Sequence, residues 1–144
     1  MVILLARQNP AVLLRLIGPV HQLSSGSLPE HIELCPPCSY AEAIQAIQGF
    51  SVGLIPFKQN VLTASVDPIK YYEYRALGLP VISTLFGEMA NRQHEPGVFL
   101  VDERHDFDRV VGVALTFRFK ADEIEAFRRA NSWQARFDAS GILP

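Results

Sequence analysis

The sequence predicts an α/β fold with an open, doubly wound parallel sheet. Three observations predict it. The strand-like runs are continuously apolar, as in parallel strands that helices cover on both faces. They alternate with helix-like segments, and 144 residues of 49% hydrophobic composition are enough for one domain, residues 1–144. We expect five strands, at residues 12–17, 31–35, 51–56, 79–84 and 97–101.

The expected helices lie between these strands. Residues 4–8, "LLARQ", resemble the end of a helix before an Asn-Pro turn, and "YAEAIQAIQGF" and "DFDRVVGVALTF" have helical periodicity. A final helix is expected at about 121–138. Ligands of such sheets bind at the carboxyl ends of the strands, where we expect the loops at 18–27, 35–39, 57–67 and 84–92 to gather.

The charge balance and the first residues exclude several classes of protein. A charged fraction of 19% and a net charge of −2 give no basic surface for nucleic acid. "MVILLARQNP" has only four large apolar residues in a row after Met1, which is too few for a signal peptide or a membrane span. We therefore expect a cytoplasmic chain. Two cysteines are too few for a secreted disulfide scaffold.

The stretch "SVDPIKYYEYRALGLPVIST", residues 65–84, combines a turn, a helix and a strand. Asp67 is a good N-cap and Pro68 suits the first helical position. Gly78 suits the position after the helix, and the proline that follows prevents continuation. The open amino end of such a helix attracts anions, because its unpaired N–H groups and its dipole act together.

Lys70 and Glu73 lie three positions apart, on one face of this helix. A surface ion pair is the simplest interpretation. A carboxylate near the strand ends can also accept hydrogen bonds from the two vicinal hydroxyls of a ribose. Lys70 would then lie beside phosphates as a point charge.

The "CPPC" run, with Cys35 and Cys38, follows an expected strand and precedes an expected helix, as a redox pair would. The helix and strand alternation that follows does not fit a thioredoxin fold. We expect two small half-buried cysteines, with Ser39 capping the next helix. No zinc spacing, P-loop, G-x-G-x-x-G or G-x-S-x-G pattern is present, and Trp133 is expected to anchor the last helix in the core.

Several motifs together resemble a known family. "F-x-VGLIPF", "DPIKYYEY", "ALG-x-PV" and "NSW-x-x-R" occur in the order and spacing of the carboxyl-terminal, nucleotide-sugar-binding domain of GT-B glycosyltransferases, especially family 4. The resemblance covers nearly the whole chain. It implies the Rossmann-like half of a GT-B fold, with its first strand absent.

The resemblance also implies a set of site residues. The family's helix glutamate, matched by Glu73, holds the ribose, and the preceding loop reaches the diphosphate or the sugar. The implied catalytic residues are Lys70 and Glu73, and the implied donor-binding residues are Pro56, Phe57, Ser65, Asp67, Pro68, Ile69, Lys70 and Glu73. Ser65 replaces a second family glutamate, as in members with an S-x-x-P-x-K variant. Ser51 and Cys35 replace a common Asp and Gly.

On this resemblance, the expected function is retaining, metal-independent transfer of a sugar from a nucleotide diphosphate sugar, with no cofactor. The expected partner is an amino-terminal acceptor-binding domain or a separate chain, because about half of a GT-B enzyme is missing. The isolated chain should therefore be weakly active at most, and membrane association is expected only through the missing parts. Two alternatives stay open: a non-catalytic nucleotide- or partner-binding module, and a thiol-disulfide protein that uses CPPC.

Overall fold

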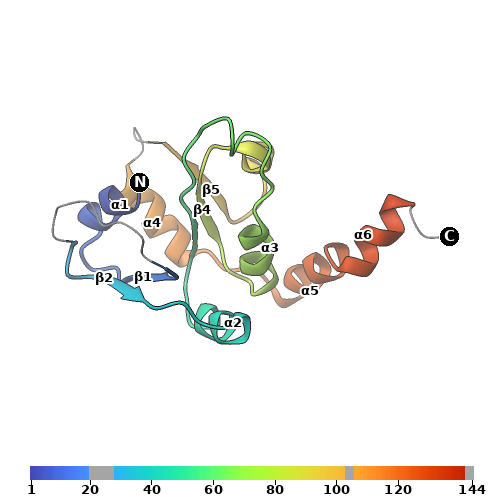
Figure 1. Cartoon of the computed structure of the whole chain (residues 1–144), viewed down its shortest axis with the longest axis horizontal. Helices are drawn as coiled ribbons and strands as arrows, with labels where there is room; N and C mark the ends of the chain where they lie inside the picture. The colour runs from blue at the N-terminus through green and yellow to red at the C-terminus, as the bar shows by residue number, and fades with distance from the viewer. Residues whose placement is uncertain (20–27, 103–105, 142–144) are drawn as a thin grey trace.

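A computed structural model describes residues 1–19, 28–102 and 106–141. It is α/β, with parallel strands separated by helices (Figure 1). The elements in chain order are α1 (Val2–Gln8), β1 (Leu14–Ile17), β2 (Ile32–Cys35), α2 (Tyr40–Gln48), β3 (Gly53–Ile55), α3 (Ile69–Ala76), β4 (Val81–Thr84), the 3-10 helix η1 (Gly87–Arg92), β5 (Val98–Val101), α4 (Phe107–Thr116), α5 (Ala121–Ala130) and α6 (Trp133–Ser140).

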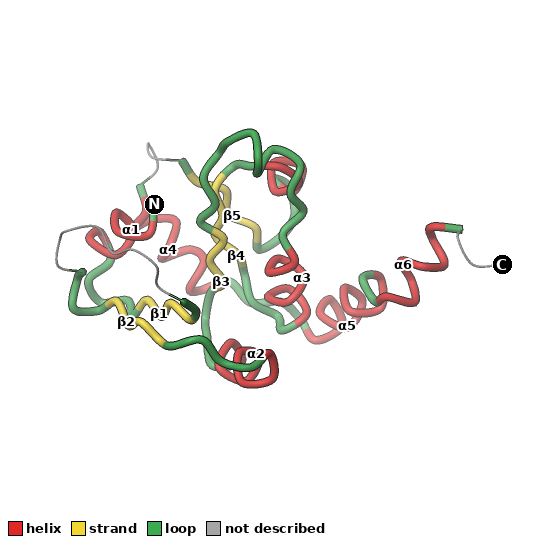
Figure 2. The backbone as a smooth tube through the Cα atoms, viewed as in Figure 1, coloured by secondary structure: helices red, strands yellow, loops and turns green. Residues whose placement is uncertain are grey.

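All five expected strands are present, but the expected single sheet is wrong for the described residues. β1 and β2 form one parallel sheet, and β3, β4 and β5 form another in that order. In Figure 2 the strands of the two sheets run in different directions. β3 and β4 are shorter than expected, and each is bounded by a proline, Pro56 after β3 and Pro80 before β4, which has no N–H to donate to a ladder.

The three-stranded sheet is covered on both faces, as continuous apolar strands predict. Along β4, Val81 belongs to one core cluster, with Ile55 and Tyr71, and Ile82 belongs to the other. The second cluster joins α1, β1, β2 and α4; its buried members are Leu5, Ala6, Leu14, Ile32, Ile82, Val101, Phe107, Val111 and Ala114. Alternate side chains of one strand thus serve two separate cores.

The short helices begin and end where the local chemistry predicts. Ser39 caps α2 through a capping box with Glu42, which confirms the expectation. Gly78 follows α3 with a φ of 77°, a conformation that favours glycine. The amphipathic α4 buries Val111 and Ala114, also as expected.

The expected single helix at about 121–138 is wrong. Two helices are present, α5 and α6, and Asn131 and Ser132 between them are not helical. The Ser132 hydroxyl caps α6 by accepting from the Ala135 N–H at 3.1 Å. Both helices extend away from the sheets (Figure 1) and neither contains a buried residue.

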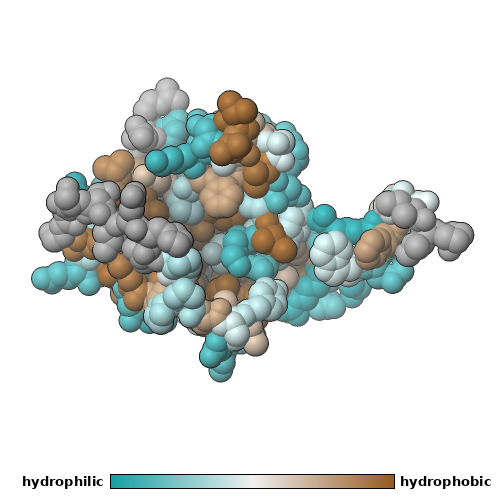
Figure 3. All heavy atoms as spheres, in the orientation of Figure 1, coloured by the Kyte–Doolittle hydropathy of each residue, from teal (hydrophilic) through white to brown (hydrophobic). Residues whose placement is uncertain are grey.

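Apolar side chains are exposed at one end of the molecule. Figure 3 shows them at the top of the view, where Figure 1 places the loop between β3 and α3. Val61 and Leu62 in this loop are 91% and 84% exposed. Among the described residues, no helix is long and apolar enough to cross a membrane.

Candidate functional site

The candidate site lies at the carboxyl ends of β3 and β4, where the loops that follow them run side by side. The Glu88 N–H donates to the Val66 carbonyl at 3.2 Å. A Cβ atom on Gly87 would approach the Val66 carbonyl oxygen to 2.4 Å, so only glycine fits here. This close contact fixes the loop that leads into α3.

The amino end of α3 differs from the expectation in one respect. The helix begins at Ile69, so its N-cap is Pro68 and not Asp67, and no side chain caps its first turn. The Asp67 carboxylate instead accepts from Tyr72 at 2.6 Å and from Arg92 at 3.0 Å. The first turn of α3 therefore has no capping side chain, although its Tyr71 N–H donates to the Pro68 carbonyl at 3.0 Å.

Lys70 and Glu73 are brought together as their spacing predicts. The Lys70 Nζ lies 2.6 Å from a Glu73 carboxylate oxygen. The Lys70 side chain is 46% exposed, whereas that of Glu73 is only 8% exposed. The half-buried Tyr74 follows directly, and its burial, with a further contribution from the Glu73 charge, raises the pKa of its phenol. The pair thus combines a half-exposed cation with a nearly buried carboxylate, one turn into α3.

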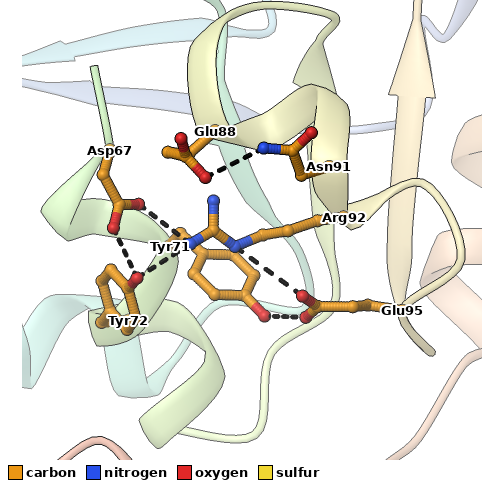
Figure 4. Close-up of polar contacts among 7 residues, drawn as sticks. All are labelled: Asp67, Tyr71, Tyr72, Glu88, Asn91, Arg92 and Glu95. Atoms are coloured by element: carbon orange, nitrogen blue, oxygen red, sulfur yellow. Dashed lines mark hydrogen bonds and ion pairs between the residues drawn. The ribbon is translucent and has the colours of Figure 1, made fainter. Parts of the chain in front are cut away.

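Arg92 organises a second polar cluster beside this helix (Figure 4). Its guanidinium reaches from η1 to Asp67, donates to the Tyr72 hydroxyl at 2.8 Å and lies 3.8 Å from the Glu95 carboxylate. It also lies 4.3 Å from the centre of the Tyr71 ring, whose hydroxyl donates to Glu95. Burial, and then the hydrogen bond to Glu95, raise the pKa of Tyr71 to about 12. The cluster joins η1, α3 and the loop before α3.

The other predicted site residues lie along the same loops without forming one pocket. Pro56 and Phe57 leave the end of β3, and the Phe57 ring packs on Phe86 with 4.9 Å between centroids. Ser65 and Ile69 are exposed, and Pro68 is buried. Among all the predicted site residues, the structure brings only Lys70 and Glu73 into direct polar contact with each other. Most of the expected loop at 18–27 lies outside the described residues.

Two cavities lie near these loops, and neither is lined by Lys70 or Glu73. The smaller, of about 260 Å³, is formed by the loops after β3 and β4; its lining residues are Gln59, Asn60, Thr63, Ala64, Leu85, Phe86 and Gly87. The larger, of about 690 Å³, lies between β1 and β3, and Pro56 is the one predicted site residue that lines it. Of the predicted donor residues, only Pro56 therefore lines either cavity.

The cysteines and histidines of the described residues take ordinary places. Cys35 ends β2 and is partly buried, as expected, but Cys38 is exposed, so the expectation of two half-buried cysteines is wrong for Cys38; both are free. The His31 Nε2 donates to the Ala6 carbonyl at 2.8 Å and so joins β2 to α1. Within the described part of the chain, no three His, Cys, Asp or Glu side chains are placed to hold a metal ion.

No sequence pattern predicts that Arg92 belongs to this polar cluster. Its partners Asp67 and Tyr72 lie 25 and 20 positions away, so no local spacing pattern contains the cluster. No protein-family model, curated protein or solved structure matches this chain.

Proposed function

We propose that this chain is a donor domain that binds a nucleotide diphosphate sugar for retaining, metal-independent glycosyl transfer. The observation that carries the proposal is the Lys70–Glu73 pair, 2.6 Å apart, one turn into a helix whose first turn has no side-chain cap. A nearly buried carboxylate suits the vicinal hydroxyls of a ribose. The uncapped helix end and the half-exposed lysine suit a diphosphate.

In this proposal the chain's own residues do three things. Glu73 accepts hydrogen bonds from the ribose, and the first-turn N–H groups of α3 bind the phosphates. Lys70 turns from Glu73 toward the leaving diphosphate and stabilises the negative charge that develops on it. The departing phosphate itself accepts the proton of the acceptor hydroxyl, so no protein base is required. The acceptor would be bound by an amino-terminal domain or a partner chain.

The test is calorimetric titration of the chain with a panel of nucleoside diphosphates and nucleotide sugars. We expect saturable binding that Glu73→Ala and Lys70→Ala each weaken by about tenfold or more, because hydrogen bonds to charged groups contribute about 1.5–3 kcal/mol. Glu125→Ala is the matched control, since it removes another ion pair with the same spacing, to Arg128 on α5. Absence of binding by the folded chain, or equal effects of Glu73→Ala and Glu125→Ala, would contradict the proposal.

A non-catalytic binding module is the second candidate. It is favoured because Lys70 and Glu73 line neither cavity, whereas glycosyl transfer needs the donor to be shielded from water. Chromatographic assays of nucleotide-sugar hydrolysis and of sugar transfer to added acceptors distinguish the two candidates. Detectable turnover by the isolated chain would contradict the module, because a non-catalytic domain leaves the bound donor intact.

A further inference from the structure

The larger cavity lies between one edge of each sheet. In the described structure, neither of these two edges has a neighbouring strand. β1 pairs only with β2, and β3 pairs only with β4. The cavity, of about 690 Å³, lies between these two edges; it is lined on one side by Leu13, Arg15 and Ile17 and on the other by Val52, Leu54 and Pro56. The two open edges therefore face one space.

The hydrogen-bond pattern shows which backbone groups point into this space. Leu14 and Gly18 donate to His31 and Cys35 of the β2 side. Since alternate residues of a parallel strand bond to opposite sides, the N–H and C=O groups of Arg15 and Ile17 point away from β2. Likewise Gly53 donates to Pro80, before β4, and the groups of Leu54 point away from β4. In the described structure, these backbone groups of β1 and β3 therefore have no neighbouring strand to pair with.

The surroundings of the cavity define the chemistry of what would fill it. Val111 and Leu115 of α4 line one part and Tyr74 of α3 lines another, and these helices belong to the separate cores on the two faces of the β3–β5 sheet. A segment between β1 and β3 would thus be covered on both faces. Such a position favours an extended run of Val, Ile and Leu.

We infer that the gap between β1 and β3 accepts one extended apolar segment of another polypeptide, which pairs as a strand with both edges and joins the two sheets. Unpaired strand edges are templates for strand addition, in which the backbone gives affinity and the side chains give specificity. The four residues of β1 and three of β3 call for an added strand of at least about four residues, and strands of about five are usual. Because the two sheets are turned relative to each other (Figure 2), the added strand must twist, as strands of open sheets do. This inference does not depend on the proposed function.

The experiment uses the full chain and a peptide probe, KKVIVIVKK, with KKVIPIVKK as its matched control, since the central proline removes a ladder donor. We expect one-to-one binding of the first peptide in a fluorescence titration and none of the second. Amide exchange of Arg15, Ile17 and Leu54, followed by NMR, should slow on binding by about tenfold or more. The Leu34 amide, on the opposite edge of β2, should not change.

Two proline variants test the edge directly. Arg15→Pro removes a donor that points into the gap and should weaken peptide binding about tenfold or more. Leu34→Pro removes a donor on the far edge and should bind normally, as should Arg15→Ala, which loses only the side chain. No binding by the wild-type chain, or binding without slower exchange at Arg15, Ile17 and Leu54, would overturn the inference. Self-association of the chain that slows exchange at the same amides would also overturn it, because the occupant would then be a second copy.

Discussion

At the scale of single residues, Tyr71 couples the polar cluster around Arg92 to the pH dependence of stability. Its folded-state pKa is raised to about 12 by burial and by the hydrogen bond to Glu95, above the value of about 10 in an unfolded chain. Below pH 10 both states keep the proton. Between pH 10 and about 12 only the unfolded state releases it, so stability falls as the pH rises.

Between pH 10 and 12, the free energy of unfolding of Tyr71→Phe should therefore fall by about 2–3 kcal/mol less than that of the wild type. Urea unfolding at several pH values from 8 to 12 measures the free energy of unfolding of each protein. Tyr40→Phe is the control, because Tyr40 is 68% exposed. Part of the fall should remain in Tyr71→Phe, since burial also raises the pKa values of Tyr72 and Tyr74. Equal slopes for wild type and Tyr71→Phe would contradict the assignment.

The residue-scale predictions from sequence succeeded where the partners are close along the chain. Lys70 and Glu73 pair because three positions place them on one helical face. Asp67 was wrongly expected to cap α3, because its carboxylate has a better partner in the guanidinium of Arg92. A charged hydrogen bond from a distant residue can replace a local one, and no local pattern signals the replacement.

At the scale of elements, Phe127 of α5 packs against the aromatic side chains of α3. The Phe127 ring lies 5.8 Å from the Tyr71 ring, 6.3 Å from the Tyr72 ring and 4.8 Å from the Arg75 guanidinium. The Arg128 Nε adds a hydrogen bond of 2.7 Å to the Ala76 carbonyl at the end of α3. α5 is thus fixed to α3, although none of its residues is fully buried.

Phe127→Ala should lower the free energy of unfolding by about 2 kcal/mol, less than the roughly 3–5 kcal/mol of a fully buried phenylalanine, because this ring is half-buried. Trp133→Ala, the aromatic control on α6, should change it by less than about 0.5 kcal/mol, since Trp133 is 73% exposed. Urea unfolding followed by circular dichroism measures both. A larger loss for Trp133→Ala than for Phe127→Ala would mean that α6, not α5, carries the contact.

Trp133 also shows why element boundaries are hard to predict here. A tryptophan on an apparently continuous helix was expected to pack in the core, but that expectation is wrong. Ser132 stops the helix and caps the next one, which turns the tryptophan toward solvent beside Phe137. By contrast, Ser39 was recognised as a cap because Glu42 completes the capping box three positions later.

At the scale of the whole molecule, the strands were predictable and their pairing was not. Apolar runs mark the strands one at a time, because the composition of a strand is a local property, although β1 and β2 leave Arg15 and Glu33 exposed. Which strands become neighbours depends on contacts between distant segments. The two-sheet arrangement, with an apolar gap between β1 and β3, follows from no single stretch of this sequence.

The separation of the sheets predicts two different local stabilities. β4 is paired on both sides, and Val81, Ile82 and Ser83 are at most 1% exposed. The β1–β2 sheet has only two strands, and its stability depends on the core cluster that Leu14 and Ile32 form with α1 and α4.

Amide exchange should therefore be slower at Val81 and Gly53, bonded within the three-stranded sheet, than at Leu14 and Gly18, bonded to the β2 side. We expect a difference in protection of about tenfold or more, measured by NMR under native conditions. Urea at low concentration should release Leu14 and Gly18 first. Adding the strand peptide KKVIVIVKK should bring the two sets of rates together, because one continuous sheet opens as one unit. Equal protection of the two sheets before any peptide is added would contradict this prediction. It would mean that the two sheets unfold together despite the gap between them.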